Sequence, residues 1–256
     1  MQIGFSKIGF PKQGALVLGV LEDSKMLAKT QEVDRNSGGM ITAAIKNSNF
    51  SGKSHQILSV FTPERRIVLY GLGKGENIDE LWSEEAGGRI FSSLEKSGEK
   101  TVTVIFENHS RTKKNIDKRA AHLAYGALLR SYKFDKYKTK DKLGKDTTLK
   151  RINVAVEQHS QAKKIFSELV AVADGIFFAR DLVSEPPNVL YPDSFAKKLT
   201  ALRKLGLKVE VLGEKEMSKL GMGALLGVGQ GSSRESKLVV MRWNGGKRGE
   251  KPIAFV

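Results

Sequence analysis

The stretch FARDLVSEPPNVLYPDSFAKKL, residues 178–199, divides the chain into two parts. Leading into it, residues 165–183 repeat apolar side chains at helical spacing, which predicts a long amphipathic helix. Pro186 and Pro187 have no amide hydrogen, so this helix must end before them and the chain must leave in an extended conformation. The residues predicted to share the apolar side of the helix are Leu169, Val172, Ile176, Phe177, Ala179, Leu182 and Val183.

A second helix is predicted after the prolines, with Asp193 or Ser194 as its N-cap and Gly206 as its end. Its apolar residues recur at helical spacing. A long helix followed by a proline break is typical of a domain boundary. We therefore expect an N-terminal domain over residues 1–160, a linking helix over 161–185 and a second domain over 186–256. The apolar residues of the second helix are Phe195, Leu199, Leu202 and Leu205.

Strand and helix patterns alternate before the boundary, which favours an α/β fold with a mostly parallel or mixed sheet flanked by helices. A helix over residues 78–97 is predicted to bury Leu81, Ala86, Ile90, Phe91 and Leu94. The polar residues from Val33 to Gln56, apart from one short helix, are predicted to form loop. The remaining predicted segments are strands at 1–10, 15–22, 57–62, 65–73, 101–107 and 151–157, and helices at 40–47 and 116–132.

Fewer elements are predicted after the boundary. Residues 207–213 and 236–244 alternate as strands, and 214–221 read as a short helix. The glycine-rich residues 224–232 predict a strand or turn, and 252–256 a short apolar strand. Arg234 and Glu235 are candidates for an ion pair within or between subunits.

Composition limits the classes of function. The 256 residues contain no cysteine, which excludes disulfides and thiolate zinc sites and fits a cytoplasmic protein. Neither a signal peptide nor a membrane span is recognisable, so we expect no membrane partner. The net charge of +15 favours contact with polyanions such as nucleic acid, but a solvated lysine-rich surface explains it better, since no base-reading motif accompanies the charge.

The most basic and least apolar region is residues 132–150. Phe134 and Tyr137 lie among its lysines and are candidates to stack on nucleic acid bases. The alternative is an exposed connection, with at most one edge strand protected by lysine. The candidate nucleic-acid-binding residues are Lys133, Lys136, Lys138, Lys140, Lys142 and Lys145.

No catalytic or metal-binding constellation is predicted. GLGKG, residues 71–75, lacks the spacing of a dinucleotide fingerprint or a P-loop, so it predicts a tight turn with positive φ. The four histidines are scattered, with no pair at metal-ligand spacing, and His122 reads as a hydrogen-bonded interior side chain. Ser184 lacks the flanking glycines of a nucleophile elbow. Asp181 and Glu185 lie one turn apart, where a structural role outweighs a cation site.

Four stretches, in order, resemble the leucine aminopeptidase (cytosol aminopeptidase) family of two-metal exopeptidases. They are GLGKG, ARDLVSEPPNVLYPDSFA (residues 179–196), LGMGALLGVGQGSSRES (220–236) and KPIAFV (251–256). The resemblance is dense in the last third of the chain and weak before it. It implies a macro-domain-like N-terminal domain, followed by the first strands and helices of an α/β catalytic domain.

The same resemblance implies a function for a longer parent protein. That protein would be a metallo-aminopeptidase that releases N-terminal residues, leucine among them, with two divalent ions such as manganese or zinc, in a homo-hexamer. In the family the metal ligands and catalytic residues follow the segment similar to KPIAFV. We therefore expect this chain to stop before the active site, to hold no metal and to be inactive alone.

The residues alone also allow a function of another class, that of a binding protein. A basic macro-like domain would serve as a binding module for nucleic acid or for an ADP-ribose type ligand. Steep salt dependence of oligonucleotide binding would favour this alternative. A third hypothesis, a purely structural domain, predicts neither a ligand nor an activity.

Overall fold

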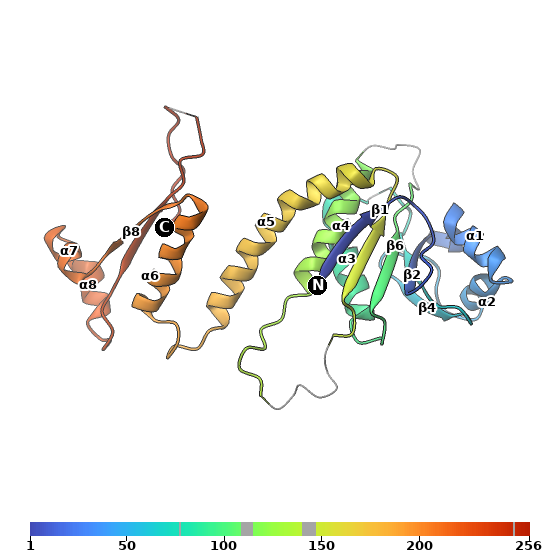
Figure 1. Ribbon diagram of the computed structural model, residues 1–256, viewed down its shortest axis with the longest axis horizontal. Helices are drawn as coiled ribbons and strands as arrows, with labels where there is room; N and C mark the ends of the chain where they lie inside the picture. The colour runs from blue at the N-terminus through green and yellow to red at the C-terminus, as the bar shows by residue number, and fades with distance from the viewer. Residues whose placement is uncertain (77, 109–114, 140–146, 248) are drawn as a thin grey trace. The chain divides into compact units, whose positions relative to one another are not determined.

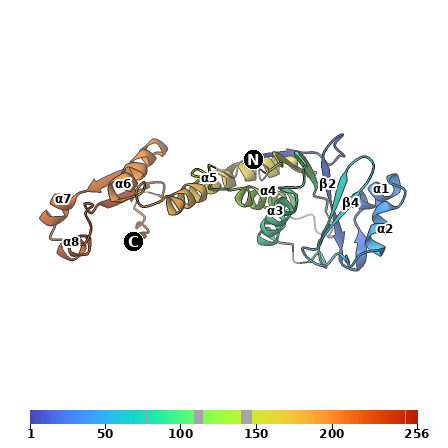
Figure 2. The ribbon, with the colours of Figure 1, turned by 90° about the horizontal axis from the view of Figure 1, so that it is seen from below.

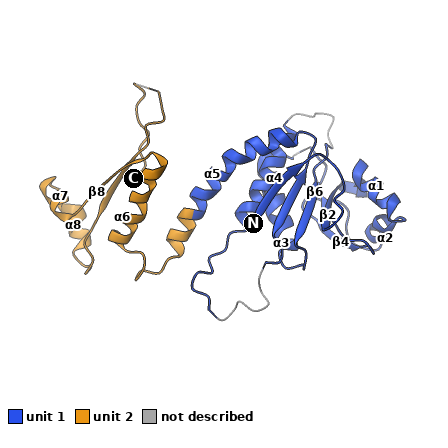
Figure 3. Ribbon diagram, in the orientation of Figure 1, with its two compact units in different colours: residues 1–177 blue, residues 178–256 orange. Residues whose placement is uncertain are grey.

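The computed structural model describes residues 1–76, 78–108, 115–139, 147–247 and 249–256. It divides into two compact units, Met1–Phe177 and Phe178–Val256 (Figure 3). The division falls inside one long helix, α5 (His159–Ser184). Each unit is described by itself below.

Unit 1 is built on a mixed sheet with the strand order β1-β7-β6-β2-β5-β4, in which β3 pairs with β2 (Figure 1). All neighbours along that order are parallel except β5 and β4, and β3 is also antiparallel. The predicted mixed sheet is therefore confirmed. The strands are β1 (Gln2–Ser6), β2 (Ala15–Leu21), β3 (Lys25–Met26), β4 (Ile57–Phe61), β5 (Arg66–Gly71), β6 (Thr101–Ile105) and β7 (Arg151–Ala155).

Helices cover both faces of the sheet (Figures 1 and 2). On one face α3 (Glu80–Leu94), α4 (Ile116–Arg130) and the first part of α5 pack over the larger apolar core. On the other face α1 (Ala28–Asn36) and α2 (Met40–Lys46) cover a smaller core. A short 3-10 turn, Glu22–Ser24, follows β2.

Two glycines let α3 and α4 approach closely. A Cβ atom on Gly87 would lie 1.9 Å from the carbonyl oxygen of Leu123, and one on Gly126 would lie 1.9 Å from that of Glu84. No side chain fits at such distances, so both positions require glycine. The predicted core residues Ala86, Ile90, Phe91 and Leu94 of α3 are buried.

Two expectations for unit 1 were wrong. Helix α1 was not predicted: residues 28–32 had no assignment and residues 33–36 were predicted as loop, because most positions are polar and give no apolar period. Only Thr30 is fully buried, and its hydroxyl donates to Gly19 O (2.8 Å). Leu81 was expected in the core but is 64% exposed. It lies in the first turn of α3, whose contact with α4 is made by the preceding residue, Glu80, through an ion pair with Lys118 (2.9 Å).

Helix α5 exists but begins earlier, and only part of its predicted apolar side packs on the core. Ala162, Phe166 and Ala173 are its buried residues. Val172 is 53% and Val183 87% exposed, and Ala179 is also exposed. Helix α5 has more apolar residues than pack against unit 1. The sequence alone could not show which of them are buried. The remaining residues of α5 that pack on the core are Ile165, Leu169, Val170, Ile176 and Phe177.

Unit 2 is smaller, and its sheet is the antiparallel pair of β8 and β9. Its buried apolar residues, among those described, are Ala196, Leu199, Val209 and Met217. Gly206 ends the helical segment with a φ of 93°, as predicted. The elements are α6 (Pro192–Thr200), a 3-10 turn (Ala201–Leu205), β8 (Lys208–Leu212), α7 (Glu214–Lys219), α8 (Gly223–Gly229) and β9 (Leu238–Arg242).

Three expectations for unit 2 were wrong. The glycine-rich segment forms helix α8, because Ala224 and the two following leucines favour a helix over the strand or turn that the glycines suggested. Residues 251–256 form no strand, because no described strand pairs with them; Phe255 is 95% exposed. The N-cap of α6 is Tyr191, whose amide donates to Ser194 Oγ (2.9 Å).

Candidate functional site

The turn after β5 occupies the carboxyl edge of the sheet in unit 1, where ligands of α/β proteins usually bind. Gly73 and Gly75 have φ values of 63° and 79°, which confirms the predicted tight turn. The Gly73 amide donates to Gly52 O (2.9 Å) and the Leu72 amide to Val20 O (2.8 Å). These donors are committed to backbone carbonyls, so this turn is not shaped as a phosphate cradle.

A histidine-centred cluster lies beside this turn. His55 Nδ1 is 2.7 Å from the Tyr70 hydroxyl, and Nε2 is 3.3 Å from the Glu85 carboxylate. The imidazole stacks on Trp82 with 5.0 Å between ring centroids. Trp82 Nε1 in turn donates to Ser54 Oγ (2.8 Å). We call Ser54, His55, Tyr70, Trp82 and Glu85 the His55 cluster.

Burial keeps the two titrating groups at the centre of the His55 cluster neutral. It raises the pKa of Tyr70, and it lowers the pKa of His55, helped by the charge of Arg89. Glu85 opposes the shift at His55, but its side chain is 52% exposed, so water screens its attraction. A neutral, fully hydrogen-bonded cluster fits a clamp that holds residues 52–55 against β5 and α3.

A second polar site lies at the start of α1. The Lys29 amide donates to both carboxylate oxygens of Glu107, at 3.0 and 3.2 Å. Burial raises the pKa of Glu107, and this bond and the nearby Lys29 charge oppose the shift. Glu107 thus occupies the anion-attracting end of α1, where a ligand phosphate would otherwise bind. This arrangement counts against an ADP-ribose type ligand at this helix.

The predicted basic site is only partly described. Lys140, Lys142 and Lys145 lie outside the described residues. Lys133 forms an ion pair with Glu95 (3.2 Å) and a hydrogen bond with the Thr147 hydroxyl. Its charge is therefore partly committed within unit 1.

The other described lysines of the segment are exposed. The Lys136 ammonium lies 5.2 Å from the centre of the Tyr137 ring, and Lys138 is also exposed. Phe134 and Tyr137 contact each other, with ring centroids 5.9 Å apart. No strand occurs in residues 132–139 or 147–150, so the edge strand considered for this segment is absent from its described part.

No metal site is present among the described residues, since no three His, Asp or Glu side chains gather there. His109 lies outside them. His122 Nδ1 is 2.7 Å from Glu84 Oε1, so the predicted hydrogen-bonded interior histidine is confirmed. Arg234 and Glu235 do not pair with each other: the Arg234 guanidinium lies 3.8 Å from the centre of the Tyr191 ring, and Glu235 pairs with Lys237 (2.9 Å).

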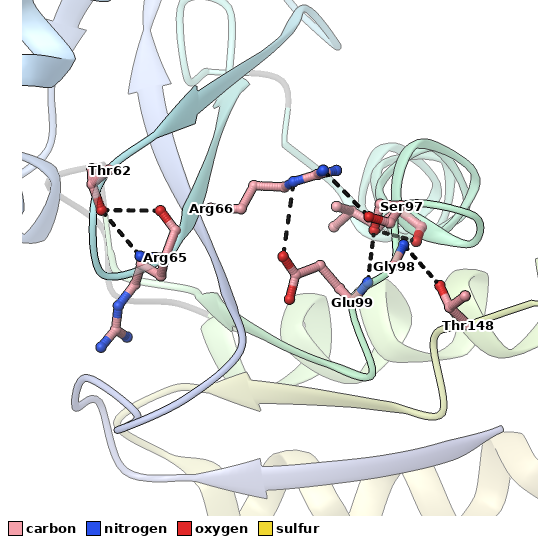
Figure 4. A network of polar contacts seen from close by, with 8 residues as sticks. Thr62, Arg65, Arg66, Ser97, Gly98, Glu99 and Thr148 are labelled. Carbon is pink, nitrogen blue, oxygen red and sulfur yellow. Dashed lines mark hydrogen bonds and ion pairs between the residues drawn. The ribbon is translucent and has the colours of Figure 1, made fainter.

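The amino edge of the same sheet carries a polar network (Figure 4). Arg66 Nη2 donates to Ser97 O (3.3 Å), while its Nε is 3.8 Å from Glu99, too far for a hydrogen bond. The Gly98 amide donates to Thr148 Oγ1 (3.1 Å), so the network joins β5 to the residues before β6 and β7.

A cavity of about 490 Å³ opens nearby, lined by Phe10, Val33, Met40 and the 62–65 turn among others. The Arg65 guanidinium in its wall already donates to Pro11 O (2.6 Å). The lining of this cavity contains no nucleophile paired with a base.

None of these sites identifies a function, but comparison with known proteins identifies a family. Residues 17–141 match the N-terminal domain, and residues 177–256 the catalytic domain, of the cytosol aminopeptidase family. The chain belongs to the cytosol aminopeptidase family. The match to the catalytic domain begins at residue 177, where the division between the two units falls.

Relatives support the assignment over the whole chain. A probable cytosol aminopeptidase of Nitrobacter winogradskyi is 41% identical over 261 residues, covering 100% of this chain and 52% of that protein. One from Wolbachia pipientis wMel is 41% identical over 266 residues, covering 100% and 49%. The chain therefore spans about half the length of the curated relatives it matches.

Solved structures support the fold. A tomato leucine aminopeptidase variant superposes with a TM-score of 0.82 at 22% identity, over 93% of this chain and 50% of that one. The bottromycin maturation enzyme BotP, in complex with Mn, gives a TM-score of 0.67 at 20% identity, over 89% and 44%. The predicted α/β arrangement is thus confirmed as that of a leucine aminopeptidase.

The His55 cluster and the Glu107 contact were missed in the sequence. Their partners come from segments far apart in the chain: Glu107 lies 78 positions from Lys29. The one available signal was position, because Glu107 is the last residue of a predicted strand, and functional side chains of α/β proteins often lie at strand ends.

Proposed function

We propose that the complete protein to which this chain contributes is a metal-dependent aminopeptidase that releases N-terminal residues, leucine among them, from peptides. The observation that carries this proposal is the match of both family domains, in order, together with 41% identity over the whole chain to a probable cytosol aminopeptidase. The basic binding module considered as an alternative has no comparable support.

The proposed cofactor is a pair of divalent ions, manganese or zinc, in the complete enzyme. BotP was solved in complex with Mn, which supports metal dependence in related structures. The described residues do not fit such a pair, since they form no three-ligand cluster. Residues 1–256 alone are therefore expected to be inactive, and no reaction step is assigned to them.

Within this proposal each part of the chain has a role. Residues 1–160 form the N-terminal domain, 161–185 the linking helix and 186–256 the beginning of the catalytic domain. The domain matches at 17–141 and 177–256 support this division. The complete enzyme is expected to act in the cytoplasm as a homo-hexamer. In the described part of the chain, no helix has the length and apolar character to cross a membrane.

The test uses the product of the complete gene. Purified with Mn²⁺ or Zn²⁺, it should release leucine from a leucine-initiated peptide, lose that activity in a chelator and regain it when metal returns. The N-acetylated peptide is the matched control, because an aminopeptidase requires a free amino group. Release that survives chelation, or equal cleavage of the acetylated peptide, would contradict the proposal.

Nucleic acid is proposed only as an additional partner of the basic segment, through Lys133, Lys136, Lys138 and the lysines at 140, 142 and 145. The affinity for a labelled duplex, measured by fluorescence anisotropy, should then fall steeply between 50 and 200 mM salt. The expected decrease is about 10³-fold if six phosphates are contacted. Replacing Lys136 and Lys138 by glutamate should reduce both affinity and salt slope; the same change at Lys163 and Lys164 of α5 is the control. No binding at low salt would remove this partner.

A further inference from the structure

The cavity of about 490 Å³ lies beside the amino edge of the sheet in unit 1, and apolar side chains form its most buried part. Leu16 and Ile67, near the starts of β2 and β5, are 1% exposed and belong to the smaller core. Val33 of α1 and Met40 of α2 are half-buried, and Phe10 is exposed. Small-molecule sites are typically cavities of about 300–1,000 Å³ lined largely by such side chains. The cavity can therefore accommodate the apolar part of a small ligand.

The 62–65 turn supplies much of the polar lining, and hydrogen bonds fix its shape. The Thr62 amide donates to Arg65 O (3.0 Å). The Thr62 hydroxyl donates to the same carbonyl oxygen (3.0 Å) and accepts from the Arg65 amide (3.2 Å), as Figure 4 shows. Pro63 restricts the turn further, because its ring fixes φ. Glu64 and Arg65 therefore extend from a rigid support.

Arg65 lies on the cavity side of the sheet. Successive side chains of a strand point to opposite faces. Ile67 of β5 belongs to the smaller core beneath α1 and α2, whereas Val68 belongs to the larger core, so the alternation places Arg65 with Ile67. Figure 4 shows the Arg65 side chain directed away from that of Arg66. Arg65 Nη1 donates to Pro11 O (2.6 Å), and no described residue accepts from another N–H of this guanidinium.

Two further polar side chains of the lining, Glu64 and Asn36, are exposed and have no hydrogen-bond or ion-pair partner among the described residues. Ser37 and Thr62 differ, because their hydroxyls donate to backbone carbonyls. The lining thus presents a free carboxylate and a guanidinium with unused N–H groups beside an apolar surface. A purely cationic ligand would meet the guanidinium, and a purely anionic one would meet the carboxylate, so both are disfavoured. A ligand that carries both charges is favoured.

We propose that this cavity binds a free α-amino acid with an apolar side chain, such as leucine, as its zwitterion. The apolar side chain occupies the buried part of the cavity, the ammonium donates to Glu64, and the carboxylate accepts from Arg65. Glu64 and Arg65 are neighbours in the chain, and an α-amino acid carries both charges on one carbon atom, whereas a peptide separates them. The inference does not rest on the proposed aminopeptidase activity, although such an enzyme would release products of this class.

The test is equilibrium dialysis of radiolabelled leucine against the 256-residue chain in the presence of a chelator, so that no metal-bound site contributes. Binding should be saturable. The carboxylate 4-methylpentanoate and the amine 3-methylbutylamine keep the apolar body of leucine but lack one charge, so each should compete at least about tenfold more weakly than unlabelled leucine. Alanine keeps both charges but has little apolar surface, and it should also compete at least about tenfold more weakly.

Variants locate the site. Glu64→Gln changes an exposed side chain, so it should leave the fold intact and weaken leucine binding about tenfold. Glu168→Gln, at an exposed position of α5 outside the lining, is the matched control and should bind as wild type does. Val33→Phe should fill the cavity and abolish binding, with circular dichroism confirming the fold.

Three results would overturn the proposal: no saturable binding of leucine by the folded chain at millimolar concentrations, binding that is indifferent to Glu64→Gln, or equal competition by 4-methylpentanoate. Failure of the complete gene product to release leucine would contradict the proposed aminopeptidase activity instead, because the dialysis measures binding to the 256 residues without turnover.

Discussion

His55 is the residue whose environment departs most from what its type would suggest. Its φ of 64° lies in the left-handed region, which costs a non-glycine residue about 1 kcal/mol. The contacts to Tyr70, Trp82 and Glu85 offset this cost by fixing the ring from three sides. The left-handed backbone conformation of His55 therefore depends on the contacts made by its neutral imidazole.

Acid should destabilise unit 1 through His55. The pKa of His55 is lowered in the folded state, so its contribution is complete above about pH 6.5, the unfolded pKa, and is lost as pH falls through the folded value. Urea unfolding between pH 8 and pH 5 measures this loss. His55→Gln should be less stable at pH 8 and should show a smaller decline toward pH 5.

The control for this experiment is His159→Gln, at a half-buried position in the first turn of α5. It should decline with acid as wild type does. Equal declines for wild type and His55→Gln would show that His55 does not couple folding to pH.

At the residue scale the sequence predicted those features that a single residue type dictates. Gly73, Gly75 and Gly206 have positive φ as expected, because the chemistry of glycine is local. The His55 cluster could not be predicted, because its members come from a loop, a strand and a helix. Which of the scattered histidines would find partners depends on the assembled sheet.

At the scale of elements, the crossing of α3 and α4 depends on a reciprocal pair of glycines. Gly87 and Gly126 each place backbone against backbone of the other helix. At such a distance, a shift of a few tenths of an ångström by the neighbouring atoms would not make room for a Cβ atom. The two helices must separate if either glycine acquires a Cβ atom.

Gly87→Ala and Gly126→Ala should therefore each lower the free energy of unfolding by about 1–3 kcal/mol, because overpacking outweighs the gain of up to about 1 kcal/mol in helix propensity. Gly88→Ala is the matched control, since its Cβ would meet Arg130 Cβ at 3.7 Å, an ordinary contact. It should stabilise unit 1 slightly. A stabilising Gly87→Ala would show that α3 and α4 are not held this closely.

Helices and strands were predicted correctly where the hydrophobic period was strong. The prediction failed where contacts with distant residues determine the secondary structure. β2, β5, β6 and β7 were predicted because their apolar runs are buried on both faces. Helix α1 was missed because its polar sequence relies on Glu107 and Thr30 rather than on an apolar stripe. Residues 251–256 have strand composition, but a strand also needs a hydrogen-bonding neighbour.

At the scale of the whole molecule, the two units differ in how much core they hold. Unit 1 contains two apolar clusters on opposite faces of its sheet, whereas only four apolar residues of unit 2 are buried in the described part of the chain. The family and the two-part organisation were predicted from four motifs, three of which lie in unit 2 or at its start. The candidate nucleic-acid site stays a prediction, since half of its lysines lie outside the described residues.

The central proposal is that this chain is part of a metal-dependent aminopeptidase and does not catalyse alone. One assay tests it most directly: release of leucine from a leucine-initiated peptide, with Mn²⁺ supplied, by the complete gene product and by residues 1–256 side by side. The account predicts steady release by the complete product and none above background by the 256 residues. Turnover by the 256 residues, or none by a folded, metal-loaded complete product, would contradict it.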